Sequence, residues 1–160
     1  MADVRVRIAD LNLVKAPQKI TTVGLGSCVG ISLYDRRLKI VGLAHIMLPD
    51  SKQFSTVTEP FKFADLSIPI LIQKMEEAGC LRRNLVAKIA GGASMFNFSD
   101  KKMISNIGAR NVEMVKKVLD EEKIVIVSES VGGNKGRTMT VDPEDGLVYI
   151  KIVGRDIFTI

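Results

Sequence analysis

Apolar and polar residues alternate along this chain in patterns that predict a protein built mainly of β-strands. From Val4 to Ile8, apolar side chains alternate with Arg5 and Arg7, which is typical of a strand with one buried face. Longer apolar runs, such as Ile20 to Leu25, are bounded by glycine, proline and charged residues that favour turns. The predicted strands cover residues 4–8, 20–25, 28–34, 39–48, 85–90, 123–128, 138–141 and 147–153, with a short last strand at 157–160.

Two segments, 64–78 and 105–122, instead have apolar side chains three and four residues apart, which predicts amphipathic helices. Pro69 has no backbone N–H, so we expect Ser67 to be the N-cap of the first helix, with Pro69 in the first turn. Gly79 suits the end of this helix, and Ser105 is the expected N-cap of the second. Two helices among about eight strands, without a regular alternation of strand and helix, indicate an α+β fold.

Length and charge narrow the class of protein further. The 160 residues fit one domain, residues 1–160. The chain has no run of about 18 apolar residues, so we expect no membrane insertion. Charged residues interrupt its first twenty positions, which excludes a secretion signal and predicts a cytoplasmic protein. The net charge is +5, but Trp is absent. Nucleic-acid binding uses a basic face with stacking aromatic side chains, so we expect acidic partners and no nucleic acid.

The chain contains only two cysteines, Cys28 and Cys80, and one histidine, His45. Two cysteines are too few for a disulfide framework and favour a reducing compartment. A metal site normally takes three or four ligands from histidine, cysteine and carboxylates, so we expect no metal and no other cofactor. The chemistry that remains open to these residues is nucleophilic catalysis by a thiol.

The segment Gly24 to Gly30 looks at first like a phosphate-binding glycine loop. The dinucleotide motif needs its third glycine at position 29 and a helix afterwards, whereas here the glycine is at 30 and a strand follows. Gly24 and Gly26 instead allow a tight bend that exposes the sulfur of Cys28. Such a bend leaves the backbone N–H groups of Gly26, Ser27 and Cys28 as candidates for an oxyanion hole. The alternative is a small buried cysteine in a strand, the usual place for free cysteine.

His45 lies within an apolar strand and is the candidate base. An adjacent imidazolium lowers the pKa of a thiol, so we expect thiolate at Cys28 at neutral pH if the two side chains meet. The alternative is a core histidine that hydrogen-bonds to a backbone carbonyl. Thr21 and Thr22 on the preceding strand are candidates for orienting the imidazole, and Thr22 shares the parity of Cys28. Both threonines also fit ordinary strand propensity.

Gly91 and Gly92 follow the strand at 85–90 and precede Ser94. They allow either a turn or a close approach of a substrate to the backbone, so we regard them as candidates near the substrate.

Five blocks of the chain, in order, resemble a known family. They are Leu25-Gly26-Ser27-Cys28-Val29, Gly42 to Asp50, Lys88 to Phe96, Asn106 to Asn111 and Gly132 to Arg137. Together they resemble the chemoreceptor glutamine deamidases, the CheD family of bacterial and archaeal chemotaxis.

The resemblance implies a core of packed β-sheets with two main helices on the outside, similar to the cysteine-hydrolase core of certain deamidating toxins. It implies a Cys–His–Thr triad, which falls on Cys28, His45 and Thr22. It implies that the chain deamidates glutamines in the cytoplasmic domain of methyl-accepting chemotaxis receptors, with a CheC-type phosphatase as a regulatory partner. The competing hypothesis is a non-catalytic regulatory subunit that binds such a phosphatase or receptor, with Cys28 merely packed.

Overall fold

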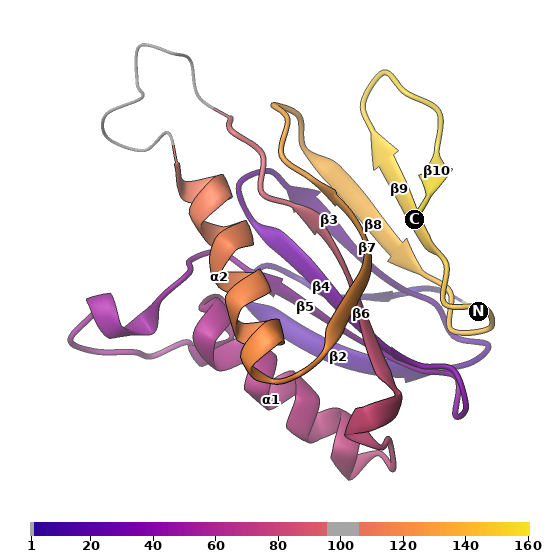
Figure 1. Cartoon of the computed structure of the whole chain (residues 1–160). Coiled ribbons are helices and arrows are strands. Elements are labelled where there is room, and N and C mark those ends of the chain that lie inside the picture. The colour runs from indigo at the N-terminus through magenta and orange to yellow at the C-terminus, as the bar shows by residue number, and fades with distance from the viewer. Residues whose placement is uncertain (1, 96–105) are drawn as a thin grey trace.

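Two five-stranded sheets and two helices make up the α+β fold of this chain in a computed structural model, which describes residues 2–95 and 106–160 (Figure 1). The α+β prediction is therefore confirmed. The first sheet has the order β1-β3-β8-β9-β10 and the second the order β2-β5-β4-β6-β7. The strands are β1 (Val4–Arg5), β2 (Asp10–Lys15), β3 (Ile20–Leu25), β4 (Val29–Asp35), β5 (Ile40–Ile46), β6 (Leu85–Gly91), β7 (Val125–Val131), β8 (Arg137–Val141), β9 (Val148–Ile152) and β10 (Phe158–Thr159).

The second sheet lies between two apolar layers. On one face, residues such as Ile31 and Ala44 pack against helix α1 (Ala64–Glu77) and helix α2 (Ile107–Glu121). On the other face, Val41 and Leu43 pack against the first sheet. Figure 1 shows both helices on one side of the second sheet and the yellow C-terminal strands on the other. Strand β4 and most of β5 are buried on both faces, which explains their nearly continuous apolar sequence.

Most predicted strands are confirmed, with boundaries shifted by one or two residues, and β3 matches its predicted range. The prediction missed β2, an edge strand paired antiparallel with β5. The alternation of Leu11 and Leu13 with polar neighbours is the signal that identifies it in the sequence. The first and last predicted strands are shorter than expected, and short strands at sheet edges limit unwanted pairing.

The range of α1 is close to the prediction, but its expected start is wrong. Phe63, not Ser67, is the N-cap, and Ser67 is a buried residue inside the helix. The earlier start is possible because the N–H of Ala64 donates to the carbonyl of Leu48 at 2.9 Å. A tertiary hydrogen bond thus satisfies a first-turn N–H group that the side chain of an N-cap residue would otherwise satisfy. Pro69 consequently lies inside the helix rather than in its first turn.

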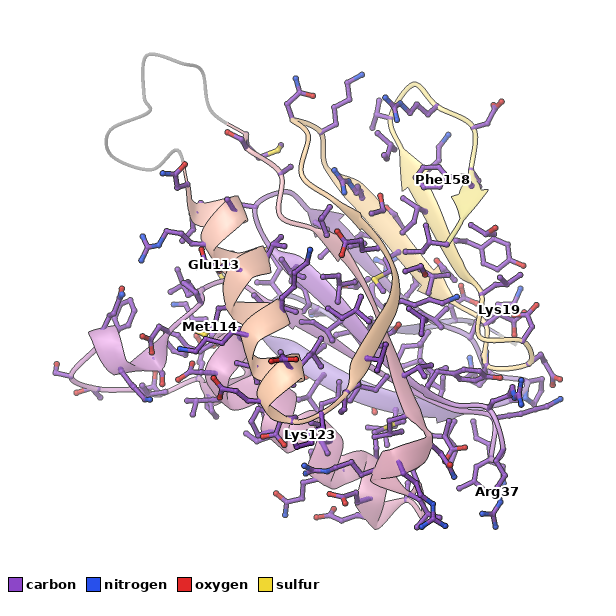
Figure 2. All side chains as sticks on the ribbon, viewed as in Figure 1. Lys19, Arg37, Glu113, Met114, Lys123 and Phe158 are labelled. Atoms are coloured by element: carbon purple, nitrogen blue, oxygen red, sulfur yellow. The ribbon has the colours of Figure 1, made fainter. Side chains whose placement is uncertain are left out.

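The N-cap of α2 is Asn106, while the expected N-cap Ser105 lies outside the described residues. Figure 2 shows the side chains of Glu113 and Met114 on α2. Together with Pro49 and Gln53 they line a shallow hollow. Short 3-10 turns lie at Ser51–Gln53, Pro60–Lys62 and Arg82–Asn84. In the described ranges, no helix is long and apolar enough to cross a membrane.

Candidate active site

The two sheets meet at the imidazole of His45. His45 lies on β5 of the second sheet and is completely buried. Its Nδ1 is 2.7 Å from Oγ1 of Thr22, which lies on β3 of the first sheet and is also completely buried. The hydrogen bond between these side chains therefore spans the interface between the sheets.

The surroundings of Thr22 determine which nitrogen of His45 carries the proton. A threonine hydroxyl has one hydrogen to donate. Thr22 donates it to the backbone carbonyl of Val6, at 2.7 Å. Its oxygen can then only accept from His45, so Nδ1 carries the hydrogen and Nε2 holds a lone pair. Nε2 has no hydrogen-bond partner among the described residues, which leaves this buried acceptor available for a proton.

Thr21 has different partners from Thr22. Its hydroxyl donates to the carbonyl of Met139 at 3.1 Å and lies 2.8 Å from Oγ1 of Thr140 on β8. Adjacent strand residues point to opposite faces, so only one of the two threonines can reach the space between the sheets. The structure brings Thr22, and not Thr21, to the histidine.

Cys28 comes directly before β4, the strand that pairs antiparallel with the histidine strand β5. In that ladder His45 is directly opposite Gly30, which is two residues after Cys28. Cys28 is half-buried and packs against the apolar cluster between the sheets. The register therefore brings the cysteine and the histidine to the same end of the ladder, and no hydrogen bond joins their side chains among the described residues.

The tight bend before Cys28 is present. Gly24 has a φ of +76°, a conformation that favours glycine. However, the N–H of Gly26 donates to the carbonyl of Gly24 at 3.1 Å, so it is not available to an oxyanion. The backbone N–H groups of Ser27 and Cys28 donate to no backbone carbonyl within residues 2–95 and 106–160. Of the three predicted oxyanion donors, these two remain candidates.

The segment of Gly91 and Gly92 is hydrogen-bonded to residues 24–28, which we call the cysteine loop. The N–H of Gly92 donates to the carbonyl of Cys28 at 2.8 Å, and the N–H of Ala93 donates to that of Gly26 at 2.8 Å. A Cβ on Gly91 would collide with the carbonyl oxygen of Cys28, and one on Gly92 would collide with Val112 of α2. Both glycines are buried, so their positions indicate a role in packing the loop rather than in facing a substrate.

Asn111 on α2 connects the cysteine loop to the end of the histidine strand. Its Nδ2 donates to the carbonyl of Ser27 and to the carbonyl of Met47, each at 2.9 Å, and the residue is completely buried. Our sequence analysis gave this asparagine no role. The available signal was a polar residue on the apolar stripe of the helix, four positions before Val115.

Burial disfavours the charged forms of both His45 and Cys28. It lowers the pKa of His45 from 6.5 to about 4. It also raises the pKa of the Cys28 thiol above its ordinary value, although a backbone N–H of the same residue partly offsets this. Burial of both groups thus works against the thiolate–imidazolium pair expected at neutral pH, and that expectation stays a prediction.

Cys80 does not belong to this site. It is 3% exposed in the helix-side core, where burial and the nearby carboxylate of Asp35 raise its pKa to about 11. Among the described residues, no group of three or more histidine, cysteine or carboxylate side chains lies together as a metal site requires.

Comparison with known proteins agrees with the family resemblance. The family model described as CheD chemotactic sensory transduction matches residues 47–152. A probable chemoreceptor glutamine deamidase CheD of Clostridium botulinum (strain Alaska E43 / Type E3) is 68% identical over 152 residues, covering 95% of this chain and 94% of the relative. The protein of the same name from Clostridium novyi (strain NT) is 63% identical over 155 residues, covering 97% and 96%.

Among solved structures, the Bacillus licheniformis hypothetical protein YfiH matches with a TM-score of 0.48 and 15% identity. The match covers 76% of this chain and 49% of that protein. This similarity is too low to support an inference about fold or activity.

Proposed function

Since this chain belongs to the CheD family, we propose that it deamidates glutamine side chains of chemoreceptors with Cys28 as nucleophile, His45 as base and Thr22 as the residue that orients the base. The observation that supports the assignment of residues is the Thr22–His45 hydrogen bond of 2.7 Å, which orients the imidazole and leaves its Nε2 without a hydrogen-bond partner among the described residues. A buried base with one nitrogen held and the other free is what nucleophilic catalysis by a thiol requires.

In the first half of the reaction, Nε2 of His45 accepts the thiol proton as the sulfur of Cys28 attacks the carboxamide carbon. The carbonyl oxygen becomes an oxyanion, which the N–H groups of Ser27 and Cys28 stabilise. When the tetrahedral intermediate collapses, the carbon–nitrogen bond breaks. His45 gives its proton to the nitrogen, ammonia departs and a thioester remains.

In the second half, His45 removes a proton from water, and the oxygen of that water attacks the thioester carbon. The carbon–sulfur bond then breaks, and the sulfur recovers the proton from His45. One glutamine and one water thus yield one glutamate and one ammonia. Because the proton leaves the thiol as the sulfur attacks, no thiolate–imidazolium pair has to persist before the substrate binds, which fits the burial of Cys28 and His45.

The product changes the charge of the receptor. A new glutamate adds one negative charge, and on a helix each like-charged pair at i,i+4 changes stability by roughly 0.2–0.5 kcal/mol. The new carboxylate is also a group that can be methylated, which fits a role in chemotactic adaptation. We further propose that the protein acts in the cytoplasm, where receptor cytoplasmic domains lie, and that a CheC-type phosphatase regulates it.

The test is incubation of a purified receptor cytoplasmic fragment with the wild-type protein, with C28A and with C80A. Mass spectrometry of receptor peptides should show glutamate in place of specific glutamines with the wild type and C80A, and none with C28A. If C28A converts the same glutamines, the thiol mechanism is wrong. If the wild type converts none but binds the fragment, the protein is a regulatory binding subunit instead.

A further inference from the structure

One face of the molecule, beside the cysteine loop, carries a concentration of positive charge. Lys135, Lys151 and Arg155 are exposed there, and the ammonium of Lys151 donates to the carbonyl of Arg155 at 2.7 Å. Burial, and secondarily the positive charge of Arg155, lowers the pKa of the Arg137 guanidinium. The ion pairs between described residues involve other cations, namely Lys19, Lys39, Arg82 and Lys116.

Arg137 is the buried member of this cationic face. It is 6% exposed, and its guanidinium donates to the carbonyls of Ser130 and Gly132. Its Nε has no partner among the described residues. Carbonyl oxygens satisfy hydrogen bonds but carry no net charge, so the positive charge of Arg137 is not neutralised by them. An anion that approached this face would compensate it.

All of these cations except Arg155 line an open groove of about 520 Å³. Lys135, Arg137 and Lys151 contribute the charge, while Met95 and Val153 contribute apolar surface. Met95 is 50% exposed and Val153 is 80% exposed, so the groove presents large apolar side chains to solvent.

The groove is continuous with the cysteine loop. Gly24, which forms the bend before Cys28, is one of its lining residues. Met95 packs against Gly26 so closely that an added Cβ on Gly26 would lie 3.2 Å from Cγ of the methionine. The N–H of Ser94 donates to the carbonyl of Gly133 at 2.9 Å, which joins this segment to the loop that carries Lys135.

We propose that this groove is the docking surface for the protein substrate, and that it selects a segment with carboxylates and apolar side chains close to the target glutamine. This inference rests on the proposed function and adds the chemical class of the segment recognised. The cations attract the carboxylates and speed encounter, and Met95 and Val153 bind the apolar side chains of the same segment. A segment held in the groove contacts the bend at Gly24, four residues before the proposed nucleophile Cys28.

The experiment measures deamidation of a purified receptor cytoplasmic fragment by K135E/K151E, with K15E/K74E as a matched control. All four lysines are exposed, and both double variants change the net charge equally. Lys15 lies at the end of β2 that is remote from His45, and Lys74 lies on α1. We expect kcat/KM to fall about tenfold or more in K135E/K151E, mainly through KM, and to stay near wild type in the control.

Alkylation of Cys28 by iodoacetamide should be unchanged in K135E/K151E, which shows that the variant is folded and its nucleophile intact. Added salt should lower kcat/KM of the wild type steeply and that of K135E/K151E little. A receptor fragment with lysine in place of the glutamates that flank its target glutamine should recover activity with K135E/K151E.

Equal kcat/KM for K135E/K151E and the wild type, with equal salt dependence, would overturn the docking inference while leaving deamidation itself established. A wild-type protein that converts no glutamine in the fragment would instead contradict the proposed function. If DNA or an anionic vesicle, but not the fragment, bound to the wild type and not to K135E/K151E, the groove would serve another anionic partner and this inference would be wrong.

Discussion

Thr22 and His45 belong to different sheets, and the 2.7 Å hydrogen bond between Oγ1 and Nδ1 is the point at which the packing of those sheets becomes part of the candidate active site. Thr22 has no charge with which to stabilise an imidazolium. Its effect is orientation, because its only hydrogen already goes to Val6 and it can serve His45 only as an acceptor.

We therefore expect T22V to lower kcat by about 10² and to cost about 1–3 kcal/mol of stability, because valine keeps the volume but removes both the acceptor for His45 and the donor to the carbonyl of Val6. T21V is the matched control. It removes the neighbouring hydroxyl, which bonds to Met139 and Thr140 instead, and kcat should stay close to wild type. Steady-state ammonia release measures both variants, and an equal effect of the two substitutions would contradict the role of Thr22.

His45 should give the protein a characteristic pH dependence of stability. Its pKa is about 4 in the folded state against 6.5 when unfolded, so the unfolded chain binds more protons between these values. The stabilising contribution is complete above pH 6.5 and is lost as the pH falls through 4, on the order of 3 kcal/mol in total. Urea denaturation at several pH values should show this loss in the wild type, and H45Q should lack it.

The same low pKa predicts the acid limb of the activity profile. His45 must be neutral to accept the thiol proton, so kcat/KM should persist well below pH 6.5 and decline only near pH 4, wherever the fold survives. A profile that falls around pH 6.5 would mean that the base is solvated or is a different group.

The two cysteines should differ in reactivity toward iodoacetamide. Cys28 is half-buried, whereas Cys80 is 3% exposed with a pKa raised to about 11, so Cys28 should be modified first. Because burial also raises the pKa of Cys28, its alkylation rate should keep increasing above pH 7. Peptide mass spectrometry resolves the two sites, and a rate that levels off below neutral pH would indicate a preformed thiolate.

Asn111 should act as a positioning residue for the cysteine loop. N111L leaves the carbonyls of Ser27 and Met47 without their donor, and we expect about 1–3 kcal/mol of lost stability together with a slower Cys28 alkylation and a lower kcat. V115A is the matched control, because Val115 is completely buried on the same helix. V115A should lose stability while its Cys28 alkylation rate and kcat stay unchanged. If both variants lose alkylation rate and kcat equally, Asn111 contributes only to packing.

Local pattern was sufficient to predict the elements that carry the site. Strands β3, β4 and β5 were predicted because an apolar run between turn residues indicates a buried strand. Cys28 and His45 were identified as candidates because the chain contains only two cysteines and one histidine. The single-domain organisation over residues 1–160 stays a prediction, as do the catalytic roles of Cys28, His45 and Thr22.

The amino-acid order by itself determined the α+β class, the antiparallel neighbourhood of Cys28 and His45, and the bend at Gly24, since each depends on residues close in sequence. Tertiary structure decided the rest. The start of α1 depends on the carbonyl of Leu48, and the place of Asn111 depends on helix packing against two loops. The pKa shifts of Cys28 and His45, which both disfavour the charged forms, depend on burial between two sheets. Desolvation arises from everything that surrounds a group, and only the folded chain brings those surroundings together.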